Sequence, residues 1–473
     1  MQKTIVWFRK DLRLHDHQAL WEASQNGSVI PIFIWPHEEH HLLSGEASLW
    51  WLHHSLLALQ EEFKEHYGVD LIIRKGNSLD ILIEVMEDTG ANALYFNERY
   101  EPFAIKRDHY VIESLNKIGV DIRTFHSNLL YNPFTIANLS GDPYKVFTPF
   151  WKRCLNESIS RPLPRPSLLN GIDKVVSTIE VAELGLLPTI RWDEKLHCYW
   201  QPGEKGAISV WELFIQKDLH SYKTGRDYPS LQAGSRLSPH LAWGEISPRA
   251  MWYSLEMEQS HIPMNEQIEA YKRQLIWREF GYYQLVHFPT ISKAPLRPAF
   301  EHFPWDENQD NLLKWQKGET GYPLVDAGMR ELWETGTMHN RVRMVVASFL
   351  VKHLLIPWTY GAKWFQHTLV DFDLANNSMG WQWVTGSGLD SAPYFRIFNP
   401  ITQGEKFDRD GEYIRKWVPE LTKLPNPYIH RPWTAPSELL KSVGIKLNET
   451  YPLPIIDHDF ARKRALAAYD KIK

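Results

Sequence analysis

Residues 4–13 read Thr4-Ile5-Val6-Trp7-Phe8-Arg9-Lys10-Asp11-Leu12-Arg13, so five β-branched or aromatic residues run directly into a charged loop. A short run of this kind is typical of a strand that is buried on both faces of a sheet. Comparable runs recur before residue 130, and amphipathic helical stretches such as residues 48–65 and 79–87 separate them. The predicted buried strands cover residues 4–8, 29–35, 70–74, 93–96 and 120–125.

Strands that alternate with helices predict a parallel sheet, because parallel neighbours need a crossover connection between them. We therefore expect an α/β domain over residues 1–130, in which a doubly wound parallel sheet has helices on both faces. The loop at residues 9–13 lacks the glycine-rich phosphate fingerprint of dinucleotide-binding proteins. This absence argues against an ordinary nicotinamide-dependent dehydrogenase.

The rest of the chain has a different pattern. Residues 131–203 are predicted to form an irregular connector, whose proline cluster at residues 161–166 cannot lie inside a helix or a central strand. Over residues 204–473 the strand patterns disappear, which predicts a second domain that is almost entirely helical. Its predicted helices cover residues 207–218, 248–257, 265–288, 323–335, 340–355 and 459–473.

Composition excludes several classes of protein. The net charge of −5 does not suit a protein that coats nucleic acid by charge alone, so a DNA site has to be a local patch. The two cysteines, Cys154 and Cys198, cannot build a disulfide framework or hold an iron–sulfur cluster. A signal-peptide pattern is absent, and the longest apolar run, residues 345–355, is too short to cross a bilayer. We expect a cytoplasmic protein that binds neither a membrane nor a metal.

Aromatic residues make up 13% of the chain, and the 21 tryptophans equal the phenylalanines in number. Large cores and an aromatic interface are the simplest explanation of this excess. Stacking on a flat ligand and relay of electrons are the alternatives, and composition alone favours the simpler explanation.

One predicted helix carries a polar face that suits a base. Gln274, Trp277, Arg278 and Gly281 follow helical spacing, so an amide, an indole and a guanidinium lie together beside a residue without a side chain. Such a face can stack on a base and hydrogen-bond to it. An interhelical polar contact explains the same pattern and is the simpler interpretation when the segment is taken alone.

Two further segments of the helical half carry polar clusters. Asn340 and Met344 are one turn apart, and Arg341 and Arg343 beside them supply positive charge. Residues 371–377 place two carboxylates and two amides within two turns. A paired-carboxylate hydrolase or a metal site is conceivable there, but metal-ligand spacing of His and Cys is missing, and such clusters are more often caps and turns.

A fourth segment, Gly234-Ser235-Arg236-Leu237-Ser238, joins backbone donors, hydroxyls and one guanidinium. This combination suits a diphosphate, because each group can donate to phosphate oxygens. Capping of a helix by Ser235 or Ser238 explains the serines nearly as well.

Together, the order and spacing of these segments resemble the photolyase/cryptochrome family, and most closely its class I deoxyribodipyrimidine photolyases. The segments that carry the resemblance are residues 6–13, Ser235-Arg236-Leu237-Ser238, Trp277-Arg278-Glu279-Phe280, Gly321-Tyr322-Pro323, residues 371–377, Gly380-Trp381-Gln382-Trp383 and Pro393-Tyr394-Phe395-Arg396-Ile397-Phe398-Asn399-Pro400. They extend over essentially the whole chain. The resemblance implies an antenna-binding domain at residues 1–130 and a helical FAD-binding catalytic domain at residues 204–473.

The resemblance also implies which residues contact the FAD. Asp371 is expected to pair with Arg343, and Asn377 to lie near the flavin N5. The predicted cofactor residues are Tyr222, Gly234, Ser235, Arg236, Leu237, Ser238, Tyr271, Arg278, Arg343, Asp371, Asp373 and Asn377. Relatives often have a hydroxyl residue at position 234, so the glycine here removes one phosphate contact.

The implied activity is a carbon–carbon lyase reaction, in which light-excited reduced FAD splits cyclobutane pyrimidine dimers in ultraviolet-damaged DNA. The predicted catalytic residues are Gln274, Asn377 and an electron relay formed by Trp381, Trp358 and Trp305. The dimer has to leave the duplex to reach the flavin. The predicted DNA and substrate contacts are Arg226, Gln274, Trp277, Asn340, Arg341, Met344, Trp383, Arg396, Gln403 and Lys406.

One residue departs from the family pattern. Dimer-repairing relatives usually have Glu where this chain has Gln274, and an amide cannot supply a proton. Six-four photolyases tend to have Gln there, but they usually place histidines at the positions of Asn340 and Met344. A cryptochrome photoreceptor is the other alternative, although many cryptochromes carry a long tail that this chain lacks. Dimer repair is therefore the favoured activity.

The family often adds an antenna pigment, either a folate or a deazaflavin. Lys293, beside Ser292, lies where folate-binding relatives contact their pigment, but these relatives can have Cys at the Ser292 position. The sequence therefore leaves the identity of the antenna pigment open. We expect a monomer of bacterial type that associates with the nucleoid when it is bound to DNA.

Overall fold

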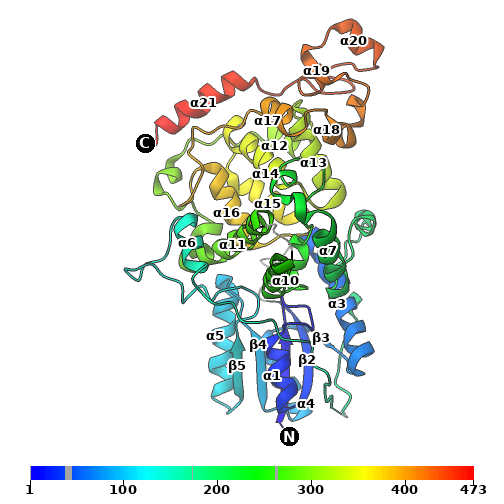
Figure 1. Cartoon of the computed structure of the whole chain (residues 1–473), viewed down its shortest axis with the longest axis vertical. Helices are drawn as coiled ribbons and strands as arrows, with labels where there is room; N and C mark the ends of the chain where they lie inside the picture. The colour runs from blue at the N-terminus through cyan, green and yellow to red at the C-terminus, as the bar shows by residue number, and fades with distance from the viewer. Residues whose placement is uncertain (1, 38–44, 173, 262–264) are drawn as a thin grey trace. The chain divides into compact units, whose positions relative to one another are not determined.

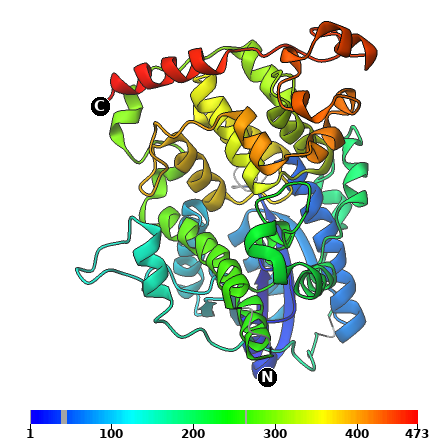
Figure 2. The ribbon, with the colours of Figure 1, turned by 45° about the horizontal axis from the view of Figure 1, so that its top comes forward.

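The computed structural model of the chain describes residues 2–37, 45–172, 174–261 and 265–473. Contacts divide the chain into two compact units. The first unit comprises Met1–His220, Ser235–Pro289 and Val370–Ala375, and the second comprises Ser221–Gly234, Thr290–Leu369 and Asn376–Lys473. Figures 1 and 2 show the ribbon from two directions.

The first unit contains a parallel sheet of five strands in the order β3-β2-β1-β4-β5. The strands are β1 (Gln2–Phe8), β2 (Gly27–Pro36), β3 (Ile72–Gly76), β4 (Ala93–Asn97) and β5 (Asp121–Phe125). In the register, Thr4 lies between Val29 on one neighbour and Ala93 on the other. The predicted doubly wound α/β fold is therefore confirmed.

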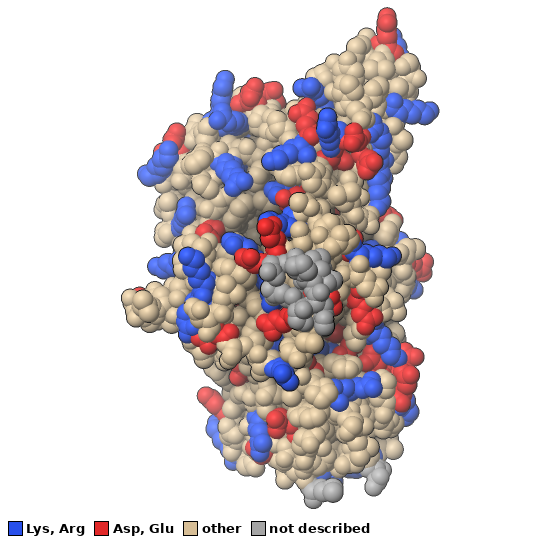
Figure 3. All heavy atoms as spheres, viewed as in Figure 1, with Lys and Arg blue, Asp and Glu red and all other residues tan. Residues whose placement is uncertain are grey.

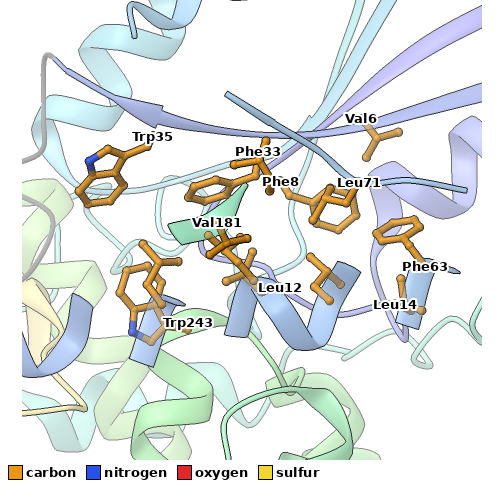
Figure 4. Packing of buried hydrophobic residues seen from close by; sticks show 14 of the residues in the cluster. Val6, Phe8, Leu12, Leu14, Phe33, Trp35, Phe63, Leu71, Val181 and Trp243 are labelled. Carbon is orange, nitrogen blue, oxygen red and sulfur yellow. The ribbon is translucent and has the colours of Figure 1, made fainter. Parts of the chain in front are cut away.

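Alternation along β1 builds a core on each face of this sheet. Val6 and Phe8 belong to one cluster, part of which is drawn in Figure 4, whereas Ile5 and Trp7 belong to the other. Helices α1 (Gln18–Asn26) and α3 (Glu46–Tyr67) pack on the first cluster, and α4 (Ser78–Thr89) and α5 (Pro102–Asn116) pack on the second. The crossover helices thus bury both faces, as parallel sheets require.

The prediction that all five strands are buried is wrong for β5. Asp121, Arg123 and Thr124 are exposed, and Ile122 and Phe125 are half-buried. This strand pairs only with β4, so it is an edge of the sheet. Charged side chains on an edge strand discourage pairing with another chain.

Further helices of the first unit follow the sheet in sequence. They are α6 (Phe147–Cys154), α7 (Glu204–Lys217), α9 (Ser238–Trp243), α10 (Pro248–His261) and α11 (Asn265–His287). Helix α6 lies inside the connector that was predicted to be irregular, so that prediction is wrong for these eight residues. Backbone contacts join the connector to the sheet, because Val29 donates to the carbonyl of Asn170 at 2.8 Å.

The second unit is helical, and past residue 204 the described residues form no strand beyond an isolated bridge between Leu447 and Tyr451. Its helices are α8 (Tyr222–Gly225), α12 (Gln309–Lys317), α13 (Pro323–Thr335), α14 (Asn340–Ser348), α15 (Trp358–Thr368), α16 (Leu374–Thr385), α17 (Pro400–Phe407), α18 (Glu412–Trp417), α19 (Asn426–Ile429), α20 (Ser437–Ser442) and α21 (His458–Asp470). The predicted helical C-terminal half is confirmed. The domain boundaries at residues 130 and 203 rest on hydrophobic periodicity and stay a prediction.

The helix predicted over residues 340–355 does not run on as one α-helix. Helix α14 ends at Ser348 and a π-helical turn, Phe349–His353, follows it. The Leu354 N–H donates to the Phe349 carbonyl at 3.0 Å, which is the wider spacing of a π turn. In the part of the chain that is described, no helix combines the length and the apolar character that a membrane span needs.

Candidate functional site

Residues 234–238, which were predicted to hold a diphosphate, lead into helix α9. A Cβ added to Gly234 would meet no atom within 4 Å, so the chain borders open space at this point. The Tyr271 hydroxyl on α11 donates a hydrogen bond of 2.8 Å to Ser235 Oγ and orients it. Leu237 is buried, whereas Ser238 is exposed at the start of α9. The segment can therefore present hydroxyls and backbone N–H groups to an anion.

The side chain of Arg236 is held by an aromatic and a backbone contact, and its expected role as a phosphate fork stays a prediction. The residue has a left-handed backbone, with a φ of 56°. Its guanidinium lies 4.5 Å from the centre of the Trp200 ring and donates to the Tyr199 carbonyl at 2.8 Å. These contacts hold the turn in its shape.

The predicted base-stacking face of α11 divides into two parts. The Trp277 indole is half-buried and stacks on Phe147 of α6, with 3.6 Å between ring centres and 4° between planes. Phe147 covers one face of the indole. Gln274 turns back along its own helix, where its Nε2 donates to the Ala270 carbonyl at 3.4 Å. Phe147 was missed by sequence reasoning, because it lies in the connector and no motif marks it.

The third residue of that face is a structural crosslink. Arg278 donates to the backbone carbonyls of Asn128 at 3.1 Å and Leu241 at 3.4 Å, so its guanidinium joins three segments of the first unit. The guanidinium also lies 5.1 Å from the centre of the Tyr282 ring. The simpler interpretation, a polar contact between elements, therefore describes the contacts that Arg278 makes.

The two aspartates of residues 371–377 are buried with 7% exposure each. The Tyr282 hydroxyl donates to Asp373 Oδ2 through a short hydrogen bond. Burial, followed by the charge of Asp373, raises the pKa of Tyr282 well above its ordinary value, so this hydroxyl remains a donor. Sequence reasoning missed Tyr282, although it follows Arg278 by one helical turn. Among the described residues, no group of three metal-ligating side chains converges.

The three predicted relay tryptophans lie in the second unit and differ in exposure. Trp381 on α16 and Trp358 at the start of α15 are buried, with 2% and 4% exposure, whereas Trp305 is half-buried. Trp305 packs on Phe303 with 4.3 Å between ring centres. This gradient from core to surface is what a relay to solvent requires.

The Trp381 indole packs against α15 at Gly361, which lies one turn after Trp358 on that helix. A Cβ on Gly361 would come within 2.1 Å of the Trp381 ring, so only glycine leaves room for it. Phe365 and Trp315 surround the same indole, with ring centres 5.1 and 6.4 Å away. Trp315 is fully buried and donates to the Val346 carbonyl at 3.0 Å, so it is a packing residue.

Two polar residues predicted to lie near the flavin are fixed by backbone carbonyls. Asn377 Nδ2 donates to the Ala362 carbonyl at 3.1 Å, and Arg343 Nε donates to the Met338 carbonyl at 2.7 Å. The expected ion pair between Arg343 and Asp371 would join the two units and stays a prediction.

The start of α14 presents the predicted dimer contacts. Asn340 is exposed and Met344 is half-buried one turn further along. His339 caps the helix by accepting from the Arg341 N–H at 3.2 Å. Burial lowers the pKa of His339 to about 4, so the ring is neutral and can serve as this acceptor near pH 7.

A basic pocket in the second unit gathers four of the five predicted phosphate contacts. It has a volume of about 440 Å³, and Arg341, Arg396, Gln403 and Lys406 line it together with Lys223, which sequence reasoning missed. Its remaining lining residues are Thr224, Asp227, Tyr228, Phe398 and Phe407. Sequence motifs could not mark Lys223, because α8 is too short to show a pattern.

Aromatic rings orient the basic groups of this pocket. The Arg341 guanidinium pairs with Asp227 at 2.7 Å and lies 4.4 Å from the centre of the Phe407 ring. The Arg226 guanidinium lies 5.3 Å from the ring of Tyr222, which is buried. Figure 3 shows positive and negative side chains interspersed over the viewed face, in keeping with the net charge of −5. The patch expected for DNA is therefore local.

The crevice at the strand-order switch between β1 and β4 is filled. Trp7 and Arg9 are buried there, and the Arg9 guanidinium pairs with Asp108 at 3.0 Å and lies 4.5 Å from the Trp7 ring. Dinucleotides bind at this point in ordinary doubly wound sheets. The filled crevice agrees with the missing phosphate fingerprint in residues 9–13.

Comparison with known proteins extends these observations. The family profile described as DNA photolyase matches residues 4–167, and the one described as FAD binding domain of DNA photolyase matches residues 271–471. The chain is 46% identical to a deoxyribodipyrimidine photo-lyase of Agrobacterium fabrum, over 99% of this chain and 98% of that protein. It is 40% identical to cryptochrome-2 of Arabidopsis thaliana, over 100% of this chain and 79% of that protein.

A solved structure agrees over the whole length. The bacterial class III photolyase of Agrobacterium tumefaciens superimposes with a TM-score of 0.97 at 45% identity, covering 100% of this chain and 98% of that one. The fold and the matched domains define a flavoprotein with an α/β half and a helical FAD-binding half. The chain belongs to the photolyase/cryptochrome family. The predicted family and FAD cofactor are confirmed, whereas the finer resemblance to class I stays a prediction.

The residues present fit an FAD. Buried carboxylates at Asp371 and Asp373 and the oriented Ser235 hydroxyl supply polar contacts. The set of twelve predicted cofactor residues is carried forward as a proposal.

Proposed function

We propose that the chain is a deoxyribodipyrimidine photo-lyase that uses light to repair cyclobutane pyrimidine dimers in DNA. The observation that carries this proposal is the basic pocket, in which Arg341, Arg396, Lys406 and Lys223 converge within one unit. A flavin photoreceptor that only signals has no need for such a pocket. The relatives named deoxyribodipyrimidine photo-lyases support the same activity.

The pocket suits the backbone around a lesion. Lysine and arginine side chains at its rim can neutralise phosphates, and Gln403 adds a neutral donor. These contacts position DNA without specifying its sequence, so affinity falls as salt rises. Arg226, the residue that ends α8, is proposed as a further phosphate contact outside the lining of this pocket.

Trp277 is the proposed wall for the flipped dimer. Because Phe147 covers one face of the indole, only the opposite face is available to a pyrimidine. A rigid aromatic wall stabilises a base outside the duplex by stacking. Unpairing a base costs a few kcal/mol and costs least for damaged bases. A dimer therefore leaves the duplex more readily than intact bases do. Trp383, Asn340 and Met344 complete the proposed dimer contacts.

Gln274 determines how the pyrimidine carbonyls are held. Its amide offers both a donor and an acceptor but no transferable proton. We infer that Gln274 orients the dimer. A glutamate at this position, as in most dimer-repairing relatives, could in addition donate a proton to the pyrimidine. Asn340 and Met344 in place of histidines argue against repair of the six-four lesion.

Reduced FAD supplies the electron that opens the cyclobutane ring when light excites it. The protein contributes position and electrostatics. Asn377, anchored on the Ala362 carbonyl, is proposed to present its amide to the flavin without adding charge. Trp381, Trp358 and Trp305 are proposed to resupply electrons from solvent, since the indole is readily oxidised.

A cryptochrome photoreceptor is the second candidate, because cryptochrome-2 of Arabidopsis thaliana aligns with 100% of this chain. Both candidates use FAD and a tryptophan relay. They differ in turnover, because a photoreceptor does not split a dimer.

The test uses purified holoprotein with reduced FAD and an oligonucleotide that contains one thymine dimer. We expect loss of the dimer under blue light and no loss in the dark, measured by chromatography of the digested DNA. A parallel oligonucleotide with a six-four lesion should remain unrepaired. Light-independent or absent repair by protein that has bound FAD would refute the proposal.

A matched pair of variants connects the pocket to the activity. Lys406→Ala should weaken binding of dimer DNA, whereas Lys423→Ala, in a different part of the second unit, should not. Equal effects of the two changes would show that the pocket is not the DNA site.

Three further expectations stay predictions. They are a folate or deazaflavin antenna, a monomeric state and a cytoplasmic, nucleoid-associated location. An absorption spectrum of protein from its native host would identify the antenna.

A further inference from the structure

The loop at residues 394–398 carries two lining residues of the basic pocket, Arg396 and Phe398. Neither a helix nor a strand covers this loop, so contacts with other segments have to hold its position. Two such contacts come from the end of α14 and the turn after it. Ser348 Oγ accepts from the Phe398 N–H at 3.4 Å, and Lys352 Nζ donates to the Arg396 carbonyl at 3.0 Å.

Lys352 is an unusual residue for this place, because it is buried with 1% exposure. Its ammonium lies 5.1 Å from the centre of the Tyr394 ring, and among the described residues no carboxylate forms an ion pair with it. Burying a charge without a counter-ion costs free energy, and an apolar side chain of similar length avoids this cost. Stability alone therefore does not explain a lysine at this position.

The backbone around Lys352 has a second uncommon feature. The residue lies in the π turn Phe349–His353 that follows α14. Single π turns within helices are rare and occur frequently at functional sites. The buried lysine and the π turn thus both point to a role beyond packing.

We propose that Lys352 is a positioning residue for DNA binding. Its ammonium holds the Arg396 carbonyl and thereby fixes the Arg396 side chain in the basic pocket. The inference rests on the proposed function, because it takes DNA phosphates to be the groups that Arg396 meets. Helix α14 then serves the pocket at both ends, since Arg341 near its start lines the same pocket.

Direct contact with DNA and a purely structural role are the alternatives. Lys352 does not line the basic pocket, so its ammonium acts through Arg396 and not on the DNA itself. A structural lysine would add to the free energy of unfolding, whereas a positioning lysine costs stability and improves DNA binding. The two roles therefore predict opposite changes in stability when the charge is removed.

The charge of Arg396 connects Lys352 to the DNA in a second way. Burial first, and then the Arg396 guanidinium, lower the pKa of Lys352 to about 7. A phosphate that binds Arg396 offsets the guanidinium charge, so DNA should raise the pKa of Lys352. Binding should then take up part of a proton, and affinity should fall as the pH rises from about 7 to about 9.

Other groups near the π turn do not produce this pH dependence. The charged or titratable groups on the elements packed against it are His353, Tyr322, Tyr394, His458, Arg464 and Tyr469. Burial lowers the pKa of His353 to about 3 and also lowers that of His458. Burial raises the pKa of Tyr322 and Tyr394. These four groups therefore keep their charge between about pH 7 and about pH 9.

The test compares Lys352→Met with the unmodified holoprotein in fluorescence anisotropy titrations of an oligonucleotide that contains one thymine dimer. The variant keeps the length of the side chain and removes its donor and its charge. We expect affinity near pH 7 to fall about fivefold, the equivalent of one hydrogen bond. The decrease in affinity toward about pH 9 should disappear in the variant. Its thermal midpoint should stay the same or rise, because a lone buried charge is removed.

Two further variants show whether Lys352 acts through Arg396. Lys423→Met, at an exposed position of the second unit, changes the net charge equally and should leave affinity and its pH dependence unchanged. In an Arg396→Gln background, Lys352→Met should weaken binding less than about twofold, because the side chain that it positions is already absent.

Calorimetry in two buffers of different ionisation enthalpy measures the proton directly and needs no variant. We expect the unmodified protein to take up part of a proton when dimer DNA binds near pH 7.5, and Lys352→Met to take up less.

The contrary results are distinct. Unchanged affinity or a lower thermal midpoint in Lys352→Met, equal weakening in Lys423→Met, or full weakening in the Arg396→Gln background would overturn the role of Lys352. Absence of proton uptake by the unmodified protein would do the same. In each of these cases the unmodified protein still binds dimer DNA, so the proposed function stands. Failure of the unmodified protein to bind dimer DNA would overturn both.

Discussion

Gly361 on α15 offers a sharp test of the electron relay. In Gly361→Ala the added methyl would lie 2.1 Å from Trp381 Cη2 and 2.6 Å from both Cζ2 and Cζ3. Ordinary carbon contacts are about 3.5 Å, so the nearest atom of the indole has to retreat by about 1.4 Å. Phe365 and Trp315 pack on the same indole, which limits the directions in which it can move.

The two consequences of this change differ in size. Overpacking a core costs about 1–3 kcal/mol, and alanine recovers about 1 kcal/mol over glycine in a helix, so unfolding becomes easier by about 0–2 kcal/mol. Misplacing a reacting group by about 1 Å can cost about 100-fold in rate. We therefore expect a folded protein whose flavin is reduced by light about 10–100 times more slowly.

The assay measures light-driven reduction of oxidised FAD by absorbance, with an external reductant as the final donor. Repair is then measured with chemically reduced enzyme and should be preserved, because the relay is not needed once FAD is reduced. In a Trp381→Phe background the smaller ring should relieve the clash, so Gly361→Ala should destabilise less. Normal photoreduction in Gly361→Ala, or an undiminished penalty in that background, would refute the packing argument.

Other predictions test the first unit and the basic pocket. Burial raises the pKa of Glu279 from 4.5 to about 7, so the folded protein retains a proton that the unfolded chain releases. The free energy of unfolding should then fall by about 3 kcal/mol as the pH rises from 4.5 to about 7. Urea unfolding at several pH values measures this decrease, which should be smaller in Glu279→Gln. Phe147→Leu removes the aromatic stack on Trp277 and should weaken binding of dimer DNA about fivefold, with little effect on undamaged DNA. Lys406→Ala should reduce the slope of log affinity against log salt by about 1, for every DNA sequence tested; an unchanged slope in fluorescence anisotropy titrations would place Lys406 off the DNA.

Much of the fold is determined locally and could be predicted. The alternation of Ile5 and Trp7 with Val6 and Phe8 specifies a strand with two buried faces, and the structure assigns these pairs to opposite cores. In β5, Asp121 and Arg123 alternate with Ile122, which already distinguishes this strand from the interior strands, so its exposure could have been predicted. By contrast, periodicity over residues 340–355 carries no sign of the π turn at Phe349–His353.

The candidate site divides in the same way. Residue types at helical spacing were sufficient to mark Trp277 and Arg278, whereas the tryptophans of the relay were marked only by the resemblance to the family. They could not show that Arg278 holds backbone carbonyls or that Arg236 stacks on Trp200, because these partners lie 36 or more positions away in sequence.

By itself, the sequence determined the α/β and helical halves, the family and the FAD cofactor, because these depend on periodicity and on motifs whose residues are close together. Only the tertiary structure decided which side chains share a cavity. The basic pocket joins Lys223 to Lys406, and a second cavity in the first unit joins Tyr131 to Lys272. Such convergence arises from packing between distant segments, and the free energy that selects it is spread over contacts that no local pattern records.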